Sequence, residues 1–221
     1  MLFLCNPNNP TGLAVKKEDL RTILAYAEEE GIFCVVDECF NEFLTRPQEY
    51  SVLEYLQSGL LSRVFILKAF TKLYAIPGLR LGYGICPDVR LLEQMEELRQ
   101  PWSVSIPAQA AGQAALGEQE FVEETRKLIT RERSYLQEGL TDLGFTVYDS
   151  CANYLFFRDK RPEAQGSLRL LYEQCLERGV LIRSCKNYRG LDGTYYRICV
   201  RKREENQALF QCLKSILTEG N

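Results

Sequence analysis

The sequence predicts an α/β fold, in which a parallel-rich sheet is followed by a smaller α+β domain. Apolar strands and amphipathic helices alternate over the first 67 residues, which is the pattern of a parallel sheet with crossover helices. Polar residues follow three of these strands, at Asn9, Asp37 and Lys72. Because the carboxyl ends of the strands in such a sheet line the ligand crevice, we expect the functional site there.

The first part of the chain supplies the elements of this sheet. Turn-forming residues 6–12 separate the first strand from a helix in which apolar side chains recur at helical spacing. Residues 68–78 are expected to form a loop. The predicted strands are Leu2–Cys5, Ile32–Val36, Val64–Leu67 and Leu79–Ile85, and the predicted helices are Lys17–Glu30 and Leu53–Leu60.

The pattern changes after Ile85, where helices are longer and strands are joined by turns or by one long connection. A large domain of residues 1–118 and a small domain of residues 119–221 are therefore predicted. The predicted helices here are Val89–Arg99, Ala108–Leu116, Phe121–Leu143, Leu168–Arg178 and Glu204–Leu217, and the predicted strands are Phe145–Tyr148, Tyr154–Phe157, Val180–Arg183 and Tyr195–Val200.

Composition excludes several classes of function. A net charge of −3 with mixed signs gives no basis for a nucleic-acid or membrane-surface role. No apolar run approaches the ~20 residues of a membrane span, and no signal peptide is found, so a cytoplasmic location is expected. The nine cysteines contain no CxxC pair, which indicates free thiols in a reducing compartment. The absence of histidine removes Ser-His and Cys-His catalysis and most metal sites, and no metal site is predicted.

One lysine stands out by its neighbours. Lys72 follows a buried strand, and Phe70, Leu73 and Tyr74 would desolvate its amine and make it a nucleophile. Arg80 follows a Pro-Gly turn, where it could hold an anion. An amine beside an anion clamp suits a cofactor that carries an aldehyde and a phosphate. For this lysine alone, a surface position in a turn is the simpler interpretation.

Four motifs in order resemble those of the fold type I pyridoxal-phosphate enzymes, in their histidinol-phosphate aminotransferase branch. The resemblance covers the whole chain. It implies part of the large domain of these enzymes, a parallel-rich sheet with one antiparallel strand, and the whole of their small domain. It also implies pyridoxal 5'-phosphate as cofactor and a homodimer in the full-length enzyme. The motifs are Asn9-Pro10-Thr11-Gly12, Asp37 at a strand end, Thr71-Lys72 with Arg80, and Arg197 in a late strand.

The resemblance implies a role for each residue that would bind the cofactor. Lys72 would bond covalently to the cofactor aldehyde and carry protons to and from Cα. Asp37 would keep the pyridine nitrogen protonated, and Asn9 would donate its amide to the ring hydroxyl oxygen. Thr71 and Arg80 would contact the phosphate. A strand-end cap is the alternative for Asp37, and an Asx turn is the alternative for Asn9.

Two positions depart from the common pattern of this family. Phe40 stands where many relatives carry a tyrosine that binds the ring hydroxyl, and Ala69 stands where a serine or threonine often binds the phosphate. Phosphate binding would then rest on Thr71, Arg80 and groups outside this sequence.

The substrate residues implied by the resemblance lie in the C-terminal part. Arg197 would hold a substrate carboxylate in a bidentate grip, and Arg183 would bind a second anion. Asn153 and Tyr188 are weaker candidates for the same pocket. An exposed strand arginine is the alternative for Arg197, and a strand-end salt bridge is the alternative for Arg183.

The chain resembles the threonine-phosphate decarboxylases of cobalamin synthesis more than a generic aminotransferase. This resemblance rests on residues 181–192 and 195–197, on residues 75–78 and 101–104, and on Phe40. The expected reaction is decarboxylation of L-threonine O-3-phosphate to an aminopropanol phosphate. Transamination of the histidinol-phosphate type uses the same residues and stays open. A non-catalytic aminotransferase-like fragment is the third possibility.

The position of the first motif predicts that the chain is the C-terminal part of such an enzyme. Relatives place three strands, a phosphate-binding helix N-terminus and an aromatic that stacks on the ring before the motif that contains Asn9. Residues 2–5 are then expected to form an edge strand with an exposed apolar face. We expect the chain alone to bind the cofactor poorly and not to turn over.

Overall fold

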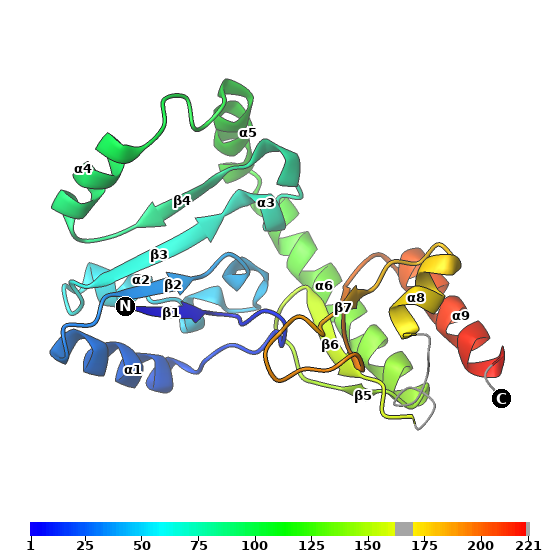
Figure 1. Ribbon diagram of the computed structural model, residues 1–221. Helices are drawn as coiled ribbons and strands as arrows, with labels where there is room; N and C mark the ends of the chain where they lie inside the picture. Colours follow the sequence, from blue (N-terminus) through cyan, green and yellow to red (C-terminus); the bar gives the residue numbers. More distant parts are fainter. Residues whose placement is uncertain (162–169, 220–221) are drawn as a thin grey trace. The chain divides into compact units, whose positions relative to one another are not determined.

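The structure is a computed structural model, and it describes residues 1–161 and 170–219 of the chain (Figure 1). The chain divides into two compact units. The first comprises Met1–Asn8 and Ala14–Arg126, and the second comprises Asn9–Leu13 and Lys127–Asn221. The division after Arg126 falls inside helix α6 (Gln119–Asp142), whereas the boundary predicted between residues 118 and 119 precedes this helix.

A four-stranded sheet, sheet A, forms the centre of the first unit. The strand order is β1-β2-β3-β4; the first three strands are parallel, and β4 is antiparallel to β3. This arrangement confirms the predicted parallel-rich sheet with one antiparallel strand. The strands are β1 (Leu2–Cys5), β2 (Cys34–Asp37), β3 (Val64–Ala69) and β4 (Gly82–Ile85).

Helices α1 (Lys17–Glu29) and α2 (Leu53–Gln57) cover one face of sheet A (Figure 1). Leu20 and Leu24 of α1 are buried against Val36 and Ile66 of the central strands. Helix α2 ends before the predicted Leu60 because Gly59 leaves the helix with a φ of +71°, a conformation that favours glycine. Two further helices of this unit are α4 (Val89–Leu98) and α5 (Ile106–Leu116).

The connection between β3 and β4 is more ordered than the predicted loop. It contains a single helical turn, α3 (Phe70–Leu73), and a 3-10 turn, η3 (Pro77–Leu79). Strand β4 starts at Gly82 and not at Leu79, because Arg80 adopts the left-handed conformation, with a φ of +54°, which interrupts an extended chain. The loop prediction for residues 68–78 is therefore wrong for most of the segment.

Strand β1 lies at one edge of the described part of sheet A and pairs only with β2 there. Leu2 and Phe3 are exposed, and Phe3 has 72% of its surface accessible. The prediction of an edge strand with an exposed apolar face is confirmed for residues 2–5.

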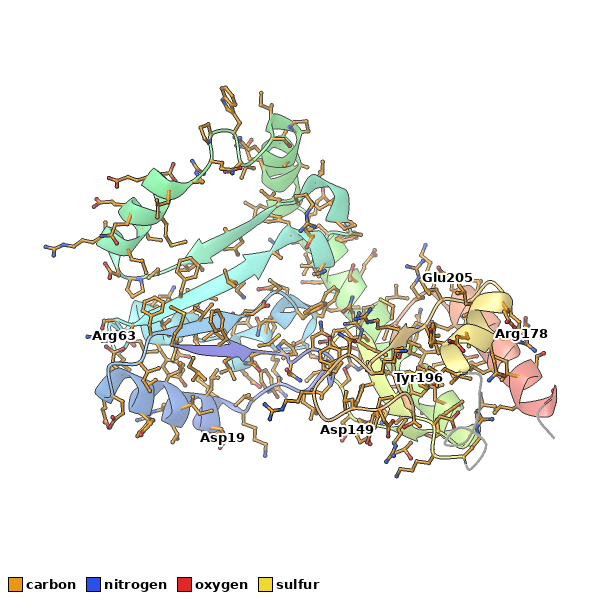
Figure 2. All side chains as sticks on the ribbon, viewed as in Figure 1. Asp19, Arg63, Asp149, Arg178, Tyr196 and Glu205 are labelled. Atoms are coloured by element: carbon orange, nitrogen blue, oxygen red, sulfur yellow. The ribbon has the colours of Figure 1, made fainter. Side chains whose placement is uncertain are left out.

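The second unit is built on sheet B, whose four strands are all antiparallel and follow the order β5-β6-β8-β7. Its helices are α6, α8 (Leu171–Glu177) and α9 (Arg203–Glu219). Tyr196, labelled in Figure 2, is buried, and its hydroxyl accepts a hydrogen bond from the Leu171 amide at 3.2 Å. The strands are β5 (Thr146–Val147), β6 (Tyr154–Arg158), β7 (Arg183–Ser184) and β8 (Tyr195–Cys199).

Strand β7 begins later than predicted. The Val180 amide donates to the Cys175 carbonyl at 2.9 Å, and Gly179 adopts a φ of +76°. These are the features of a helix C-terminus, so residues 178–180 form the C-terminal cap of α8. The prediction of a strand over Val180–Arg183 is thus wrong at its first residues. The predicted start of the preceding helix at Leu168 lies outside the described residues.

Two general expectations can be compared with the described residues. None of the helices described is long and apolar enough to cross a membrane. None of the nine cysteines, all of which lie in the described part, forms a disulfide, and four of them are buried.

Candidate cofactor and substrate sites

Lys72 lies in α3, directly after the carboxyl end of β3. Phe70 and Leu73 point into the core at 8% and 5% exposure, so Lys72, between them, is on the solvent side of this turn. Its ammonium lies 5.5 Å from the centre of the Phe40 ring. The prediction that Phe70, Leu73 and Tyr74 desolvate the amine is therefore wrong, because a helical turn places neighbouring residues on different faces.

Lys68, in strand β3 and four residues before Lys72, has the opposite environment. It is buried, and its ammonium contacts the Glu38 carboxylate at 2.8 Å and the Glu42 carboxylate at 3.0 Å. Burial lowers the pKa of Lys68, but the two carboxylates outweigh it and raise the pKa above the ordinary value. Lys72 forms no ion pair within the described residues. Of the two lysines, Lys72 is the one whose amine is accessible to a reagent.

Asp37 is the last residue of β2, in register with Cys5 of β1 and Leu67 of β3. Its Oδ1 accepts a hydrogen bond from the Cys39 amide at 2.9 Å, so the strand-end cap considered above is present. Burial, with the Asp37 carboxylate as second cause, raises the pKa of the Cys39 thiol to about 12. Asp37 forms no ion pair with a described residue, and it shares with Lys72 the edge formed by the carboxyl ends of β1, β2 and β3.

The two residues predicted to bind the cofactor phosphate differ in exposure. Thr71 is buried and precedes Lys72 in α3. Arg80 is exposed, and its guanidinium donates a hydrogen bond to the Pro77 carbonyl at 3.0 Å. Its present partner is thus a neutral acceptor, which an anion could displace.

Asn9, Tyr188 and Arg197 lie together in the second unit, although they are far apart in the sequence. The Asn9 Oδ1 accepts hydrogen bonds from the Arg197 guanidinium at 2.6 Å and from the Tyr188 hydroxyl at 3.3 Å. The amide oxygen is thereby occupied, and the Nδ2 group of Asn9 is the donor that remains for another molecule.

The segment Asn9–Leu13 is held against the second unit by backbone contacts. The Cys151 amide donates to the Gly12 carbonyl at 2.9 Å. Gly12 has a φ of +75°, and a Cβ there would lie 2.1 Å from the Ser150 hydroxyl oxygen. Only glycine fits this position without displacing Ser150.

Arg183 and Arg197 face one another in the register of β7 and β8. Both line a cavity of about 390 Å³, together with Tyr172, Ser184 and Cys199. Arg197 stacks over the Tyr154 ring at 5.0 Å, and Arg183 donates to the Asn187 side chain at 3.1 Å. No described carboxylate pairs with either guanidinium, so the salt-bridge alternative for Arg183 is not found in the part of the chain described.

Asn153 precedes β6, and its carbonyl accepts the Val200 amide at 2.9 Å. Its Oδ1 is buried and has no hydrogen-bond partner among the described residues. A buried acceptor without a donor is costly, so this oxygen is suited to a ligand that supplies one.

Sequence reasoning missed three residues around these sites. Tyr154 supports Arg197, while Glu38 and Lys68 hold the segment that follows Asp37. A signal for Tyr154 existed, because it directly follows Asn153 on a predicted strand. The sequence carries no comparable signal for Lys68 and Glu38, because the partner of a buried charged residue cannot be identified from sequence alone.

An accessible lysine and a carboxylate thus lie at one edge of sheet A, and two arginines face one another on sheet B. A sequence profile of aminotransferase class I and II matches residues 1–213. The chain belongs to this family.

The relatives include enzymes with two activities. The chain is 37% identical to a threonine-phosphate decarboxylase of Salmonella typhimurium over 218 residues, which are 98% of this chain and 57% of that enzyme. It is also 37% identical to a histidinol-phosphate aminotransferase of Symbiobacterium thermophilum over 223 residues, which are 100% of this chain and 57% of that enzyme. The chain thus spans little more than half the length of these relatives.

The fold agrees with a solved relative. The crystal structure of the histidinol-phosphate aminotransferase from Clostridium acetobutylicum matches 98% of this chain with a TM-score of 0.89 and 30% identity, and the match covers 64% of that chain.

Proposed function

We propose that this chain carries the lysine and the substrate-anion residues of a pyridoxal-phosphate enzyme that decarboxylates L-threonine O-3-phosphate. The product would be (R)-1-aminopropan-2-yl phosphate, used in cobalamin biosynthesis. We further propose that the complete enzyme is a cytoplasmic homodimer. The observation that carries the proposal is the cavity lined by both Arg183 and Arg197.

The residues of the first unit fit this cofactor. Lys72 offers an accessible amine, and Asp37 offers a carboxylate that no described cation neutralises, at the same edge of the sheet. When bound, pyridoxal phosphate supplies an aldehyde for amino groups and a ring that takes up the electron pair released at Cα. Asp37 would hold a proton at the ring nitrogen, which strengthens this electron uptake.

The remaining residues would orient the cofactor and the substrate. Thr71 and Arg80 would donate hydrogen bonds to the cofactor phosphate, and the Nδ2 group of Asn9 would donate to the ring hydroxyl oxygen. Lys72 would return a proton to Cα after the carboxylate has left.

Two arginines that line one cavity favour a substrate with two anions. L-Threonine O-3-phosphate carries a carboxylate and a phosphate, and each can bind one arginine with two parallel hydrogen bonds. Arg197 would take the carboxylate and Arg183 the phosphate. Asn153 and Tyr188, expected in the same pocket, are not among the described residues that line this cavity. Tyr188 would act beside it, through the Asn9 side chain that it shares with Arg197.

A second candidate is transamination of the histidinol-phosphate type. It is favoured by the equal identity, 37%, of the chain to the aminotransferase of Symbiobacterium thermophilum. The same residues would serve, but the Cα–H bond would break instead of the Cα–carboxylate bond. A third candidate is a non-catalytic aminotransferase-like fragment.

Product analysis separates the three candidates. The chain is incubated with pyridoxal phosphate and L-threonine O-3-phosphate, with Lys72→Ala as control. Release of carbon dioxide that depends on Lys72 supports the decarboxylase, and formation of an oxo acid supports the aminotransferase. If neither product forms and no cofactor absorption band depends on Lys72, this chain is non-catalytic by itself.

A further inference from the structure

Among the described residues, the ammonium of Lys68 has three partners, and all of them come from the segment that follows Asp37. Its Nζ lies 2.8 Å from Glu38, 3.0 Å from Glu42 and 3.3 Å from the Asn41 side-chain oxygen. An ammonium has three N–H donors, so these contacts use all of them. Lys68 thus joins strand β3 to the short turn η1 (Asn41–Phe43).

Glu38 extends this connection to a further element. It is completely buried, and its carboxylate accepts hydrogen bonds from the Ser51 hydroxyl at 2.8 Å and the Val52 amide at 2.8 Å. Val52 immediately precedes α2. A buried carboxylate needs both a countercharge and donors, and Lys68 supplies the countercharge.

Glu42 is held by a second cation, Arg126, in addition to Lys68. Arg126 donates to the Glu42 carbonyl at 2.8 Å and to its carboxylate at 3.1 Å. Lys68 and Arg126 together therefore fix the position of Glu42, which lies two residues after Phe40.

Phe40 lies between the residues that Lys68 holds. The Lys68 partners Glu38 and Asn41 flank it in the sequence, and its ring faces the Lys72 ammonium at 5.5 Å. The Cys39 amide, in the same segment, holds the Asp37 carboxylate. One buried ammonium thus holds the segment that contacts both Lys72 and Asp37.

We propose that Lys68 is a positioning residue that holds residues 38–42 so that Phe40 supports the Lys72 amine and Cys39 orients the Asp37 carboxylate. This inference rests on the proposed function of Lys72. It does not require Lys68 to touch the cofactor. The two carboxylates keep Lys68 charged at neutral pH, as the raised direction of its pKa indicates.

The experiment compares the 221-residue chain with Lys68→Met, Lys68→Arg and the double variant Lys68→Met with Glu38→Gln. Each is incubated with pyridoxal phosphate and reduced with borohydride, and the rate of Lys72 modification is followed by peptide mass spectrometry. Hydrogen exchange of residues 38–44 and urea unfolding are measured on the same samples without cofactor. The double variant removes the unpaired buried charge that Lys68→Met leaves, and so separates loss of positioning from loss of stability.

In the Lys68→Met chain, we expect the rate of Lys72 modification to fall about tenfold or more, because a small misplacement of a reacting group slows its reaction strongly. Exchange in residues 38–44 should rise. The double variant should recover its urea midpoint but not its modification rate, and Lys68→Arg, which keeps the charge and donors, should recover most of the rate.

Two outcomes overturn the inference. One is a wild-type modification rate in the folded Lys68→Met chain or in the double variant. The other is unchanged hydrogen exchange in residues 38–44. If Lys72 is not modified even in the wild-type chain, this chain by itself does not attach the cofactor, and the exchange measurement still decides whether Lys68 holds this segment.

Discussion

The Oδ1 of Asn9 accepts a hydrogen bond from the guanidinium of Arg197 at 2.6 Å, across 188 positions of sequence. Arg197 also lies over the Tyr154 ring, so its side chain is held from two sides. A guanidinium fixed in this way loses little freedom when it binds a carboxylate, which favours a bidentate contact.

Replacement of Arg197 tests this arrangement. Arg197→Ala should weaken binding of L-threonine O-3-phosphate by roughly 2–5 kcal/mol, the scale for truncation of one partner of a buried charge pair. Calorimetric titration of the cofactor-loaded protein measures this loss. Arg201→Ala is the control, because Arg201 is exposed and pairs with Glu205. Equal losses in the two variants would show that Arg197 contributes only to the overall charge.

Arg183 should act on the second anion of the substrate. Because Arg183 faces Arg197 across the two strands, Arg183→Gln should weaken binding of L-threonine O-3-phosphate more than binding of L-threonine. A charge-assisted hydrogen bond of this kind contributes roughly 1.5–3 kcal/mol. The ratio of the two dissociation constants is the measurement. The same loss for both ligands would make Arg183 a structural residue.

The parallel sheet and the position of its polar strand ends could be predicted because they depend on local patterns. Alternation of apolar strands with amphipathic helices located β1, β2 and β3, and Asp37 and Lys72 follow from the ends of the last two. The direction of the Lys72 side chain could not be predicted in the same way. It depends on whether the chain after β3 forms a loop or the single helical turn α3, and such turns have weak sequence signals.

Contacts between residues that are far apart in the sequence also could not be predicted. The contact of Asn9 with Arg197 depends on the register of sheet B and on the docking of residues 9–13, for which no local pattern exists. The same holds for the buried ion pair of Lys68 with Glu38, which no local pattern predicts. Sequence identified the residue types and their order, and tertiary packing decided their partners.

The accessible lysine should be the one that reacts with the cofactor. Borohydride reduction of the chain with pyridoxal phosphate should modify Lys72 and leave Lys68 unmodified, because Lys68 is buried between two carboxylates. Lys72→Ala should abolish the modification at this site, and in the full-length enzyme it should also remove turnover. Peptide mass spectrometry identifies the modified residue. A label on Lys68 in the folded chain would reassign the role of Lys72.

Gly12 should be required for a steric reason that can be separated from its backbone conformation. Gly12→Ala adds a Cβ at 2.1 Å from the Ser150 hydroxyl oxygen, whereas Gly144→Ala adds one with nothing within 4 Å, and both glycines have positive φ. Gly144→Ala should cost about 1 kcal/mol of unfolding free energy from conformation alone. Gly12→Ala should cost a further 1–3 kcal/mol, roughly the scale of overpacking. Urea unfolding gives both values, and equal costs would contradict the steric account.

Glu132 should make the stability of the chain sensitive to acid. It is fully buried; burial opposes its charge, but hydrogen bonds from Arg203, Asn206 and Arg131 prevail and hold the pKa of Glu132 below its ordinary 4.5. Its stabilising contribution is therefore complete above the unfolded pKa and is lost as pH falls through the lower folded pKa. Glu132→Ala should cost roughly 1–3 kcal/mol of unfolding free energy at neutral pH, because the buried Asn206 side chain loses an acceptor while Arg131 and Arg203 stay partly exposed to water. It should also flatten the loss of stability below pH 4.5. The control is Glu205→Ala on the outer side of α9 (Figure 2), whose exposed pair with Arg201 contributes about 0.5 kcal/mol or less. Urea unfolding from pH 7 to pH 3 measures both variants, and an unchanged acid dependence in Glu132→Ala would show that other carboxylates carry it.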